Sequence, residues 1–271
     1  MNLSTTAGTC SASLVIEHAL AMVRTLLIRG MLVGLVAGFL ALGFAEVFGE
    51  PQVDHAITFE SQRARAAGEP AEPALVSRDT QKTAGLTVAV GLYATAFGGF
   101  FALAFAVAYG RLGRLSARAT AALVAAGGFV AVVLVPFLKY PANPPAIGNP
   151  DTLDRRTALY FAMIAISVLT TMLAVRLGRQ LTPRVGGWNA ALIASGTFLV
   201  VTAAVWVVLP AVNEVPTDFP ATVLWRFRLS SLGTQLVLWT AMGLLFGALT
   251  ERSPKAPHAL RLRPTSEPTS Q

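Results

Sequence analysis

Residues 29–55 read RGMLVGLVAGFLALGFAEVFGEPQVDH, and this stretch decides the fold class. From Gly30 to Phe48 it is apolar except for Glu46. At about 1.5 Å per residue, such a helix covers most of the ~30 Å of hydrocarbon in a bilayer. The chain then reaches a predicted break at Gly49-Glu50-Pro51 and becomes polar. The stretch therefore predicts a membrane-spanning helix that ends among oxygen and nitrogen ligands at one membrane face.

The same apolar pattern recurs along the chain. The 271 residues are 54% hydrophobic and 13% charged, and the apolar residues gather in blocks long enough to span a membrane. Backbone amides in lipid must be hydrogen-bonded within their own segment, which favours helices. We therefore predict an all-α integral membrane protein, a bundle of six transmembrane helices with irregular proline-rich outer loops. The predicted spans cover about 26–48, 83–109, 119–138, 157–177, 190–209 and 230–249.

Lysine and arginine residues follow the predicted topology. They precede the first span, fill the connections after the second and fourth spans, and recur after the last span, whereas most acids lie in the other connections. Short loops rich in Lys and Arg stay cytoplasmic. We expect a multi-pass protein of the cytoplasmic (inner) membrane with both termini in the cytoplasm. The net charge of +7 then reflects topology and attraction to anionic lipid, and we expect no nucleic-acid partner.

The sequence divides into three regions. Residues 1–21 lack the features of a removable signal peptide, and Met22-Val23-Arg24 resembles a natural start, so we predict a disordered or overcalled N-terminal extension. Residues 22–251 form the six-span membrane domain. Residues 252–271 are rich in Pro, Ser, Thr and basic side chains, which predicts a disordered cytoplasmic tail. The single cysteine, Cys10, excludes an intrachain disulfide.

Two predicted spans carry glycines at intervals of four residues. Glycines at this spacing clear one helix face and let a second helix approach closely. The pattern predicts packing within the bundle, or a surface for a partner subunit, and the sequence leaves both open. The glycines are Gly30, Gly34 and Gly38 in the first span and Gly243 and Gly247 in the last.

Carboxylates and one imidazole gather where the first span ends. An acid near hydrocarbon is costly unless it faces a polar cavity, which makes Glu46 a functional candidate. Together with Glu50, Asp54 and His55 it suits a divalent ion such as Co²⁺, Ni²⁺, Zn²⁺ or Mn²⁺. The alternative is that Glu46 pairs with an arginine of a neighbouring outer loop. The four such arginines are Arg155, Arg156, Arg226 and Arg228.

The two later outer loops also contain oxygen ligands among prolines. These side chains could complete a site for a hard cation at the outer mouth, but they are equally ordinary turn residues. The possible ligands are Asn143, Asp151, Asn213, Glu214 and Asp218. The spans themselves contain no deep ionisable side chain, which disfavours a proton relay through this chain alone.

Several segments resemble one known family. Arg24-Thr25-Leu26-Leu27 with the glycine-spaced span, and Glu46 to Pro51, resemble the start of the predicted cobalt transporter subunit CbtA family. Leu134 to Pro145 and Leu209 to Pro216 are similar to other outer turns of that family, and the resemblance covers about Met22 to Leu249. It implies an integral membrane subunit for cobalt uptake linked to cobalamin synthesis. It also implies a small, single-span, histidine-containing CbtB-like partner, whose histidines could complete the ligand set.

We therefore expect a membrane subunit of an uptake transporter for cobalt or a similar divalent ion, with no cofactor other than the transported ion. The main alternative is a non-transporting membrane scaffold that binds a protein or lipid partner through its outer loops. A membrane enzyme is disfavoured because the chain lacks a zinc-peptidase motif, a phosphate-binding loop and a serine-hydrolase motif.

Overall fold

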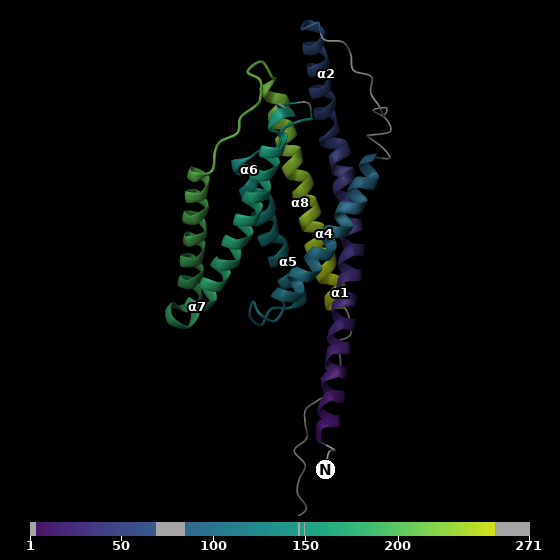
Figure 1. The fold of residues 1–271 in the computed structure, drawn as a ribbon, viewed down its shortest axis with the longest axis vertical. Coiled ribbons are helices and arrows are strands. Elements are labelled where there is room, and N and C mark those ends of the chain that lie inside the picture. The colour runs from purple at the N-terminus through teal and green to yellow at the C-terminus, as the bar shows by residue number, and fades with distance from the viewer. Residues whose placement is uncertain (1–3, 69–84, 146, 149, 253–271) are drawn as a thin grey trace, which may run out of the picture.

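The computed structural model describes residues 4–68, 85–145, 147–148 and 150–252, and every regular element in these ranges is a helix (Figure 1). This confirms the predicted all-α class. The helices are α1 (Ser4–Phe48), α2 (Glu50–Ala66), α4 (Leu86–Ala108), α5 (Ala117–Gly128), α6 (Val135–Lys139), α7 (Leu153–Val208) and α8 (Ala221–Glu251), with a π-helix η2 (Phe129–Leu134) and a 3-10 helix η3 (Pro150–Thr152).

Five helical segments of the described chain are long and apolar enough to cross a membrane, one fewer than predicted. They are Leu20–Phe48, Leu86–Ala108, Ala117–Lys139, Leu153–Val208 and Ala221–Glu251. The count differs because the predicted spans 157–177 and 190–209 both fall in α7. Gly186 inside α7 has φ 79° and ψ 159°, which is not helical. Figure 1 shows the chain folding back there, so that α7 consists of a first arm, residues 153–185, and a second arm, residues 187–208.

The polar connections separate to the two ends of the bundle. In Figure 1, α2 and the segments 140–152 and 209–220 lie at the upper end, which we call the α2 end. The connection 109–116 and the turn at Gly186 lie at the opposite end, which we call the Gly186 end. The acid-containing and the arginine-rich connections therefore lie at opposite ends.

Helix α1 packs against α4 and α8, and α5 packs against α8. The glycine stripes lie at these contacts. A Cβ added to Gly34 would be 2.7 Å from the Cα of Gly98 in α4, and one added to Gly243 would be 2.6 Å from the Cβ of Ala125 in α5. Gly30 and Gly38 likewise face α4, and Gly247 faces α5. Both stripes therefore pack inside the bundle, where only hydrogen fits between the backbones.

The third span is not a uniform α-helix. Its middle part, η2, is a π-helix, and Pro136 is the second residue after the end of η2. Proline offers no N–H to the carbonyl four residues earlier, and its ring crowds the preceding turn, so a wider turn relieves both problems. The ring of Trp239 packs where a side chain at Gly128 would lie, directly before η2.

The N-terminal segment is helical in the structure, and most of the C-terminal tail lies outside the described residues. Helix α1 begins at Ser4, so helix covers most of the segment for which disorder or an overcalled start was predicted. The translation start stays a prediction. Residues 253–271, which hold nearly all of the predicted tail, and residues 69–84 of the first outer loop lie outside the described residues.

Candidate functional site

The predicted break at Gly49-Glu50-Pro51 does not interrupt the helix. Gly49 has helical angles of φ −90° and ψ −53°, its N–H donates to the carbonyl of Ala45 over 2.7 Å, and its carbonyl accepts from the N–H of Val53 over 3.2 Å. Pro51 lies in the first turn of α2, where a proline is tolerated. Helix α2 therefore continues α1 away from the spans.

This continuity spreads the predicted metal ligands along a helix. Glu46, Glu50 and Asp54 are four residues apart, so they form one stripe with about 6 Å of helix rise between neighbours. An ion with ligands at about 2 to 2.6 Å can touch two successive side chains of such a stripe, but not three. In the part of the chain that the structure describes, no three His, Cys, Asp or Glu side chains gather. His55 and the three acids thus do not surround one ion.

Two of the three acids in the stripe, Glu46 and Asp54, also face away from the bundle, whereas Glu50 is half-buried. Ala37 in α1 is completely buried, and nine residues at about 100° each place Glu46 on the opposite side of the helix. Glu46 is exposed accordingly. In α2 the same division recurs, with Ala56 buried and Asp54 exposed. Glu46 therefore does not face a polar cavity inside the bundle.

An arginine of the outer loops does pair with a carboxylate, but the acid is not Glu46. Arg156 Nη1 lies 3.3 Å from Glu214 Oε2, and the two side chains are 25% and 17% exposed. The other oxygen of Glu214 accepts a hydrogen bond from the hydroxyl of Thr152. No ion pair between described residues includes Glu46. The pair instead joins the start of α7 to residues 209–220, which we call the strap.

The other predicted mouth ligands also have structural surroundings. The Asn143 side-chain oxygen accepts from Arg228 Nη2 over 3.0 Å. Asp218 lies 3.7 Å from Arg63 of α2, with both side chains more than half exposed. Asp151 and Asn213 are exposed at the surface. The predicted ligands therefore share the α2 end, but several of them tie its loops together.

The strap is held by further contacts that sequence reasoning missed. The hydroxyl of Tyr140 donates to the carbonyl of Pro210 over 2.9 Å. Beside the strap, Lys139 Nζ donates to the carbonyl of Trp206 in the second arm of α7 over 2.7 Å. Phe219 is buried and meets Phe59 of α2 edge to face at 5.1 Å. Burial raises the pKa of the Tyr140 phenol, and the nearby charge of Arg155 lowers it by less.

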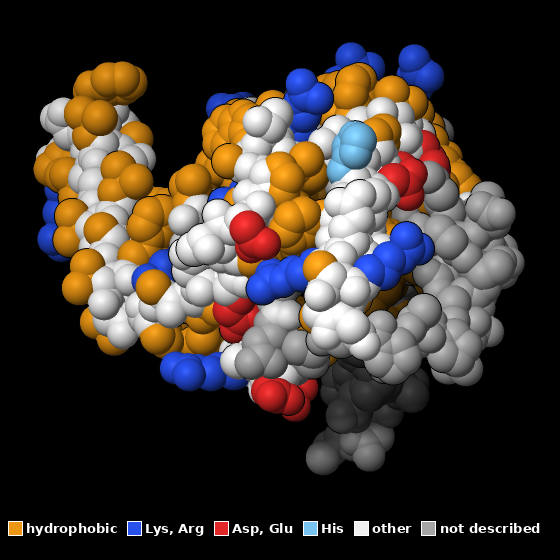
Figure 2. Space-filling model, turned by 90° about the horizontal axis from the view of Figure 1, so that it is seen from above, with side chains coloured by type: hydrophobic (Ala, Val, Ile, Leu, Met, Phe, Trp, Pro, Cys, Tyr) orange, Lys and Arg blue, Asp and Glu red, His pale blue; other side chains and the backbone are white. Residues whose placement is uncertain are grey.

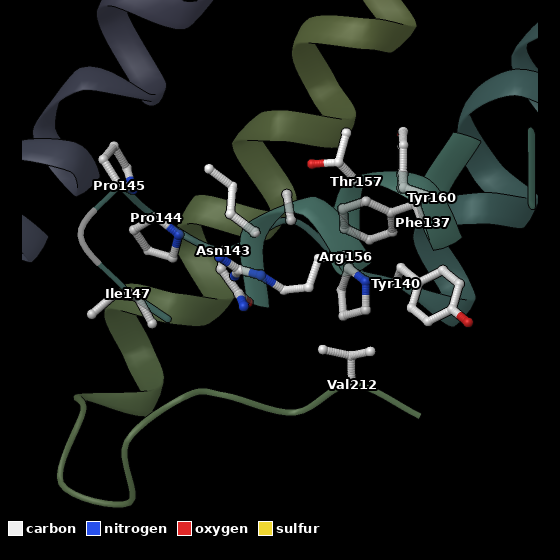
Figure 3. A pocket seen from close by; sticks show the side chains of 13 residues that line it. Phe137, Tyr140, Asn143, Pro144, Pro145, Ile147, Arg156, Thr157, Tyr160 and Val212 are labelled. Carbon is white, nitrogen blue, oxygen red and sulfur yellow. The ribbon is translucent and has the colours of Figure 1, made fainter. Parts of the chain in front are cut away.

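A cavity of about 540 Å³ lies beneath the strap, between the end of α6 and the start of α7 (Figure 3). Its walls combine a guanidinium, hydroxyls and an amide with aromatic and aliphatic groups. Among them are Arg156, Thr157, Tyr160, Asn143, Phe137 and Val212. A second, smaller cavity of about 360 Å³ lies between the outer part of α1 and α8, and Arg226 lines it.

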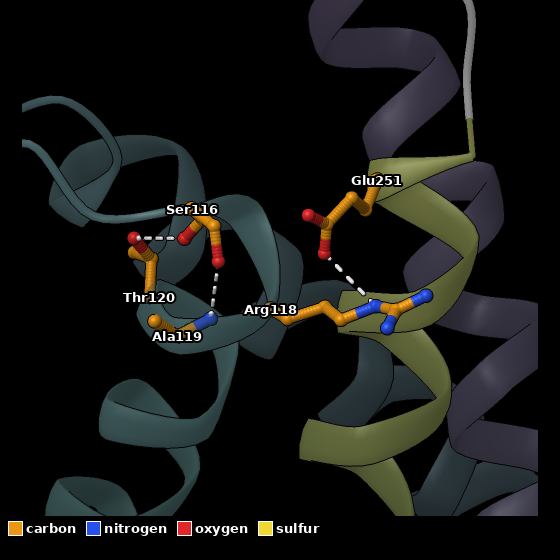
Figure 4. Close-up of polar contacts among 5 residues, drawn as sticks. All are labelled: Ser116, Arg118, Ala119, Thr120 and Glu251. Carbon is orange, nitrogen blue, oxygen red and sulfur yellow. Dashed lines mark hydrogen bonds and ion pairs between the residues drawn. The ribbon is translucent and has the colours of Figure 1, made fainter.

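The Gly186 end is fixed by a different set of polar contacts (Figure 4). The hydroxyl of Ser116 caps α5 by accepting from the N–H of Ala119 over 3.2 Å. Arg118 Nε lies 2.9 Å from a carboxylate oxygen of Glu251 at the end of α8. Both side chains of this pair are more than a third exposed, so it contributes little to stability.

Comparison with known proteins identifies the family. The family described as probable cobalt transporter subunit (CbtA) matches residues 23–251. No curated protein and no solved structure matches the chain. The matched range covers all but the first three residues of the five helical segments that can cross a membrane. It also covers α2 and the two other segments of the α2 end. The chain is therefore a membrane protein that belongs to the CbtA family of probable cobalt transporter subunits.

Proposed function

We propose that this protein is the membrane-spanning subunit of an uptake transporter for Co²⁺ or a similar divalent ion in the cytoplasmic membrane. The observation that carries the proposal is the family match over residues 23–251, on a chain whose described helices are long and apolar enough to span the bilayer. A family of transporter subunits also argues against an enzyme.

The proposed topology has six spans, with the two arms of α7 crossing separately. The break at Gly186 and the return of the chain in Figure 1 support this. Arginines crowd the Gly186 end, where Arg114, Arg118 and Arg184 lie in or beside the connections. The positive-inside rule then places this end and both termini in the cytoplasm, and it places the α2 end outside.

The acidic stripe of α1 and α2 is the proposed first contact for the ion. Glu46 and Glu50 are close enough along the helix to bind one ion together, and so are Glu50 and Asp54. The ion would bind first to one pair and then to the other. Because Glu46 and Asp54 face away from the bundle, the other ligands of the ion would come from a second protein. A small CbtB-like subunit with histidines, packed against this face, would supply nitrogen ligands that suit cobalt.

Uptake of radiolabelled cobalt tests the proposal. The host would lack its other cobalt routes, and it would carry the gene and its neighbours, or the same set with this gene deleted. We expect uptake at limiting Co²⁺ to disappear with the deletion and to return when the gene is supplied on a plasmid. Unchanged uptake in the deletion strain would refute a role in cobalt transport.

Reporter fusions test the topology separately. Alkaline phosphatase is active only outside, and a green fluorescent protein fluoresces only inside. We expect phosphatase activity for fusions in the strap and fluorescence for fusions at Gly186 and after Arg252. Phosphatase activity at Gly186 would contradict six spans.

A further inference from the structure

The cavity beneath the strap has the composition of a site for an amphiphilic anion. Its volume of about 540 Å³ lies in the range of small-molecule sites. Figure 3 shows Arg156 at its centre, with Phe137, Tyr140 and Tyr160 on one side. Val212 of the strap lies at the bottom of this view. Aromatic side chains with a polar tip are typical of the membrane–water interface. The cavity therefore suits a ligand with a polar and an apolar part.

Arg156 has hydrogen-bonding capacity left in this cavity. Its Nη1 pairs with Glu214, whereas its Nε is buried and makes no hydrogen bond to a described atom. A guanidinium offers five N–H donors in a planar fork that matches phosphate oxygens. Thr157 and Tyr160, which each carry a hydroxyl, line the same cavity and offer two more donors.

Two further cations lie near Tyr140, which is one of the residues that line the cavity. Lys139 Nζ lies 5.9 Å from the centre of the Tyr140 ring, and the charge of Arg155 acts on the Tyr140 phenol. Glu214 offsets part of the charge of Arg156. Asp151 and Asp154 belong to the same region, but they do not line the cavity. Lys139 and Arg155 do not line it either, so Arg156 is the cation among the residues that line the cavity.

Below the cavity, the first arm of α7 presents apolar side chains without protein cover. Phe161 is 64% exposed and Leu169 is 59% exposed. Figure 2, viewed from the α2 end, shows at the left a hydrophobic arm that stands apart from the rest of the molecule; by its place in Figure 1 this is the second arm of α7, which lies beyond the first arm. Acyl chains can therefore extend from the cavity along the exposed face of the first arm.

We propose that the cavity beneath the strap binds the headgroup of an anionic phospholipid from the leaflet at the α2 end. The phosphodiester lies against Arg156 and the hydroxyls of Thr157 and Tyr160. The acyl chains follow the exposed face of the first arm of α7. The lipid thus fills the space between the strap and the bundle and supports the geometry of the α2 end. This site is separate from the acidic stripe and does not depend on cobalt transport.

Native mass spectrometry of the full-length protein tests the site, with phosphatidylglycerol or phosphatidylcholine added to delipidated protein in detergent. We expect retained phosphatidylglycerol at collision energies that remove phosphatidylcholine. Val212→Trp fills the cavity from the strap and should abolish this difference. Arg155→Gln removes a cation near Tyr140 and should weaken retention about fivefold. Arg179→Gln is the matched control, because it removes an exposed arginine at the opposite end of the same arm.

Each outcome decides between the lipid and its alternatives. Selective retention that is lost in Val212→Trp and reduced in Arg155→Gln, but kept in Arg179→Gln, supports the proposal. Equal retention of the two lipids, or equal retention by Arg155→Gln and Arg179→Gln, overturns it. Displacement of phosphatidylglycerol by equimolar inorganic phosphate would assign the cavity to a free anion instead. If Val212→Trp does not fold, Arg155→Gln alone decides, since that side chain is exposed.

Discussion

The carboxylate of Glu214 lies 3.3 Å from the guanidinium of Arg156, and this ion pair fastens the strap to the first turn of α7. With 17% and 25% of the side chains exposed, the pair is largely shielded from water. Thr152 donates to the second carboxylate oxygen. A shielded pair with an added hydrogen bond loses more when one partner is removed than an exposed pair does.

Glu214→Gln should therefore lower the free energy of unfolding by about 1–3 kcal/mol, because Arg156 keeps its charge but loses its counterion. Asp218→Asn is the control in the same strap. Its pair with Arg63 is longer, at 3.7 Å, and exposed, so the change should be at most about 1 kcal/mol. Thermal unfolding of both variants in one detergent makes the comparison. Equal losses in the two variants would contradict a larger contribution of the Glu214 pair to stability.

Gly34→Ala should destabilise the contact between α1 and α4. The new methyl group would lie 2.7 Å from the Cα of Gly98, so the helices would have to separate, which costs about 1–3 kcal/mol. Gly43 is on the same helix, and a Cβ there meets nothing within 4 Å. Gly43→Ala should be neutral or stabilising by up to about 1 kcal/mol. The unfolding temperature of Gly34→Ala should fall, and that of Gly43→Ala should stay the same or rise. Equal unfolding temperatures would contradict the close contact at Gly34.

Gly186→Ala tests the fold-back of α7. Its φ of 79° and ψ of 159° lie in a region that is essentially restricted to glycine, so alanine should cost about 1–3 kcal/mol. A Cβ at this position meets no atom within 4 Å, so backbone strain is the whole effect. Gly187→Ala, with equally open surroundings and no positive φ, should not destabilise the protein. A wild-type unfolding temperature for Gly186→Ala would argue against the fold-back.

Tyr140 gives a prediction at high pH. Its pKa is raised above the ordinary value of 10.0, mainly by burial, so the folded state holds the phenol proton more tightly than the unfolded state does. The associated stability is fully present below pH 10 and is lost as the pH rises through the folded pKa. Tyr140→Phe should therefore lose less stability than the wild type between pH 10 and 11.5. Parallel unfolding curves in both proteins would contradict this assignment.

The helical fold and the placement of the glycines could be expected from sequence, because membrane spans follow from hydropathy and close packing follows from glycine spacing. The count of separate helices could not. The predicted spans 157–177 and 190–209 fall in the two arms of α7, which the non-helical residue Gly186 divides. The π-helix before Pro136 was also missed: the proline indicates a disturbance of the helix, but it does not by itself select a π-helix.

The arrangement of the candidate site could not be read from the sequence, for a geometric reason. Neighbours in sequence were treated as neighbours in space, but a helix that continues through Gly49 separates Glu46 from Asp54 and turns both away from the bundle. One of the predicted arginines, Arg156, does pair with an acid, but that acid is Glu214 and not Glu46. Glu214 meets Arg156 because the strap folds back over α7, which no local pattern of residues indicates.

The most direct measurement of the central claim is the rate of cobalt uptake at limiting Co²⁺ in cells that express Glu46→Gln. Glu60→Gln serves as the matched control, because it makes the same change at an exposed position farther along α2. If the acidic stripe receives the ion, Glu46→Gln should reduce uptake severalfold at unchanged protein level, and Glu60→Gln should leave it near the wild-type rate. Equal uptake by both variants would contradict the assignment of Glu46 as a cobalt ligand.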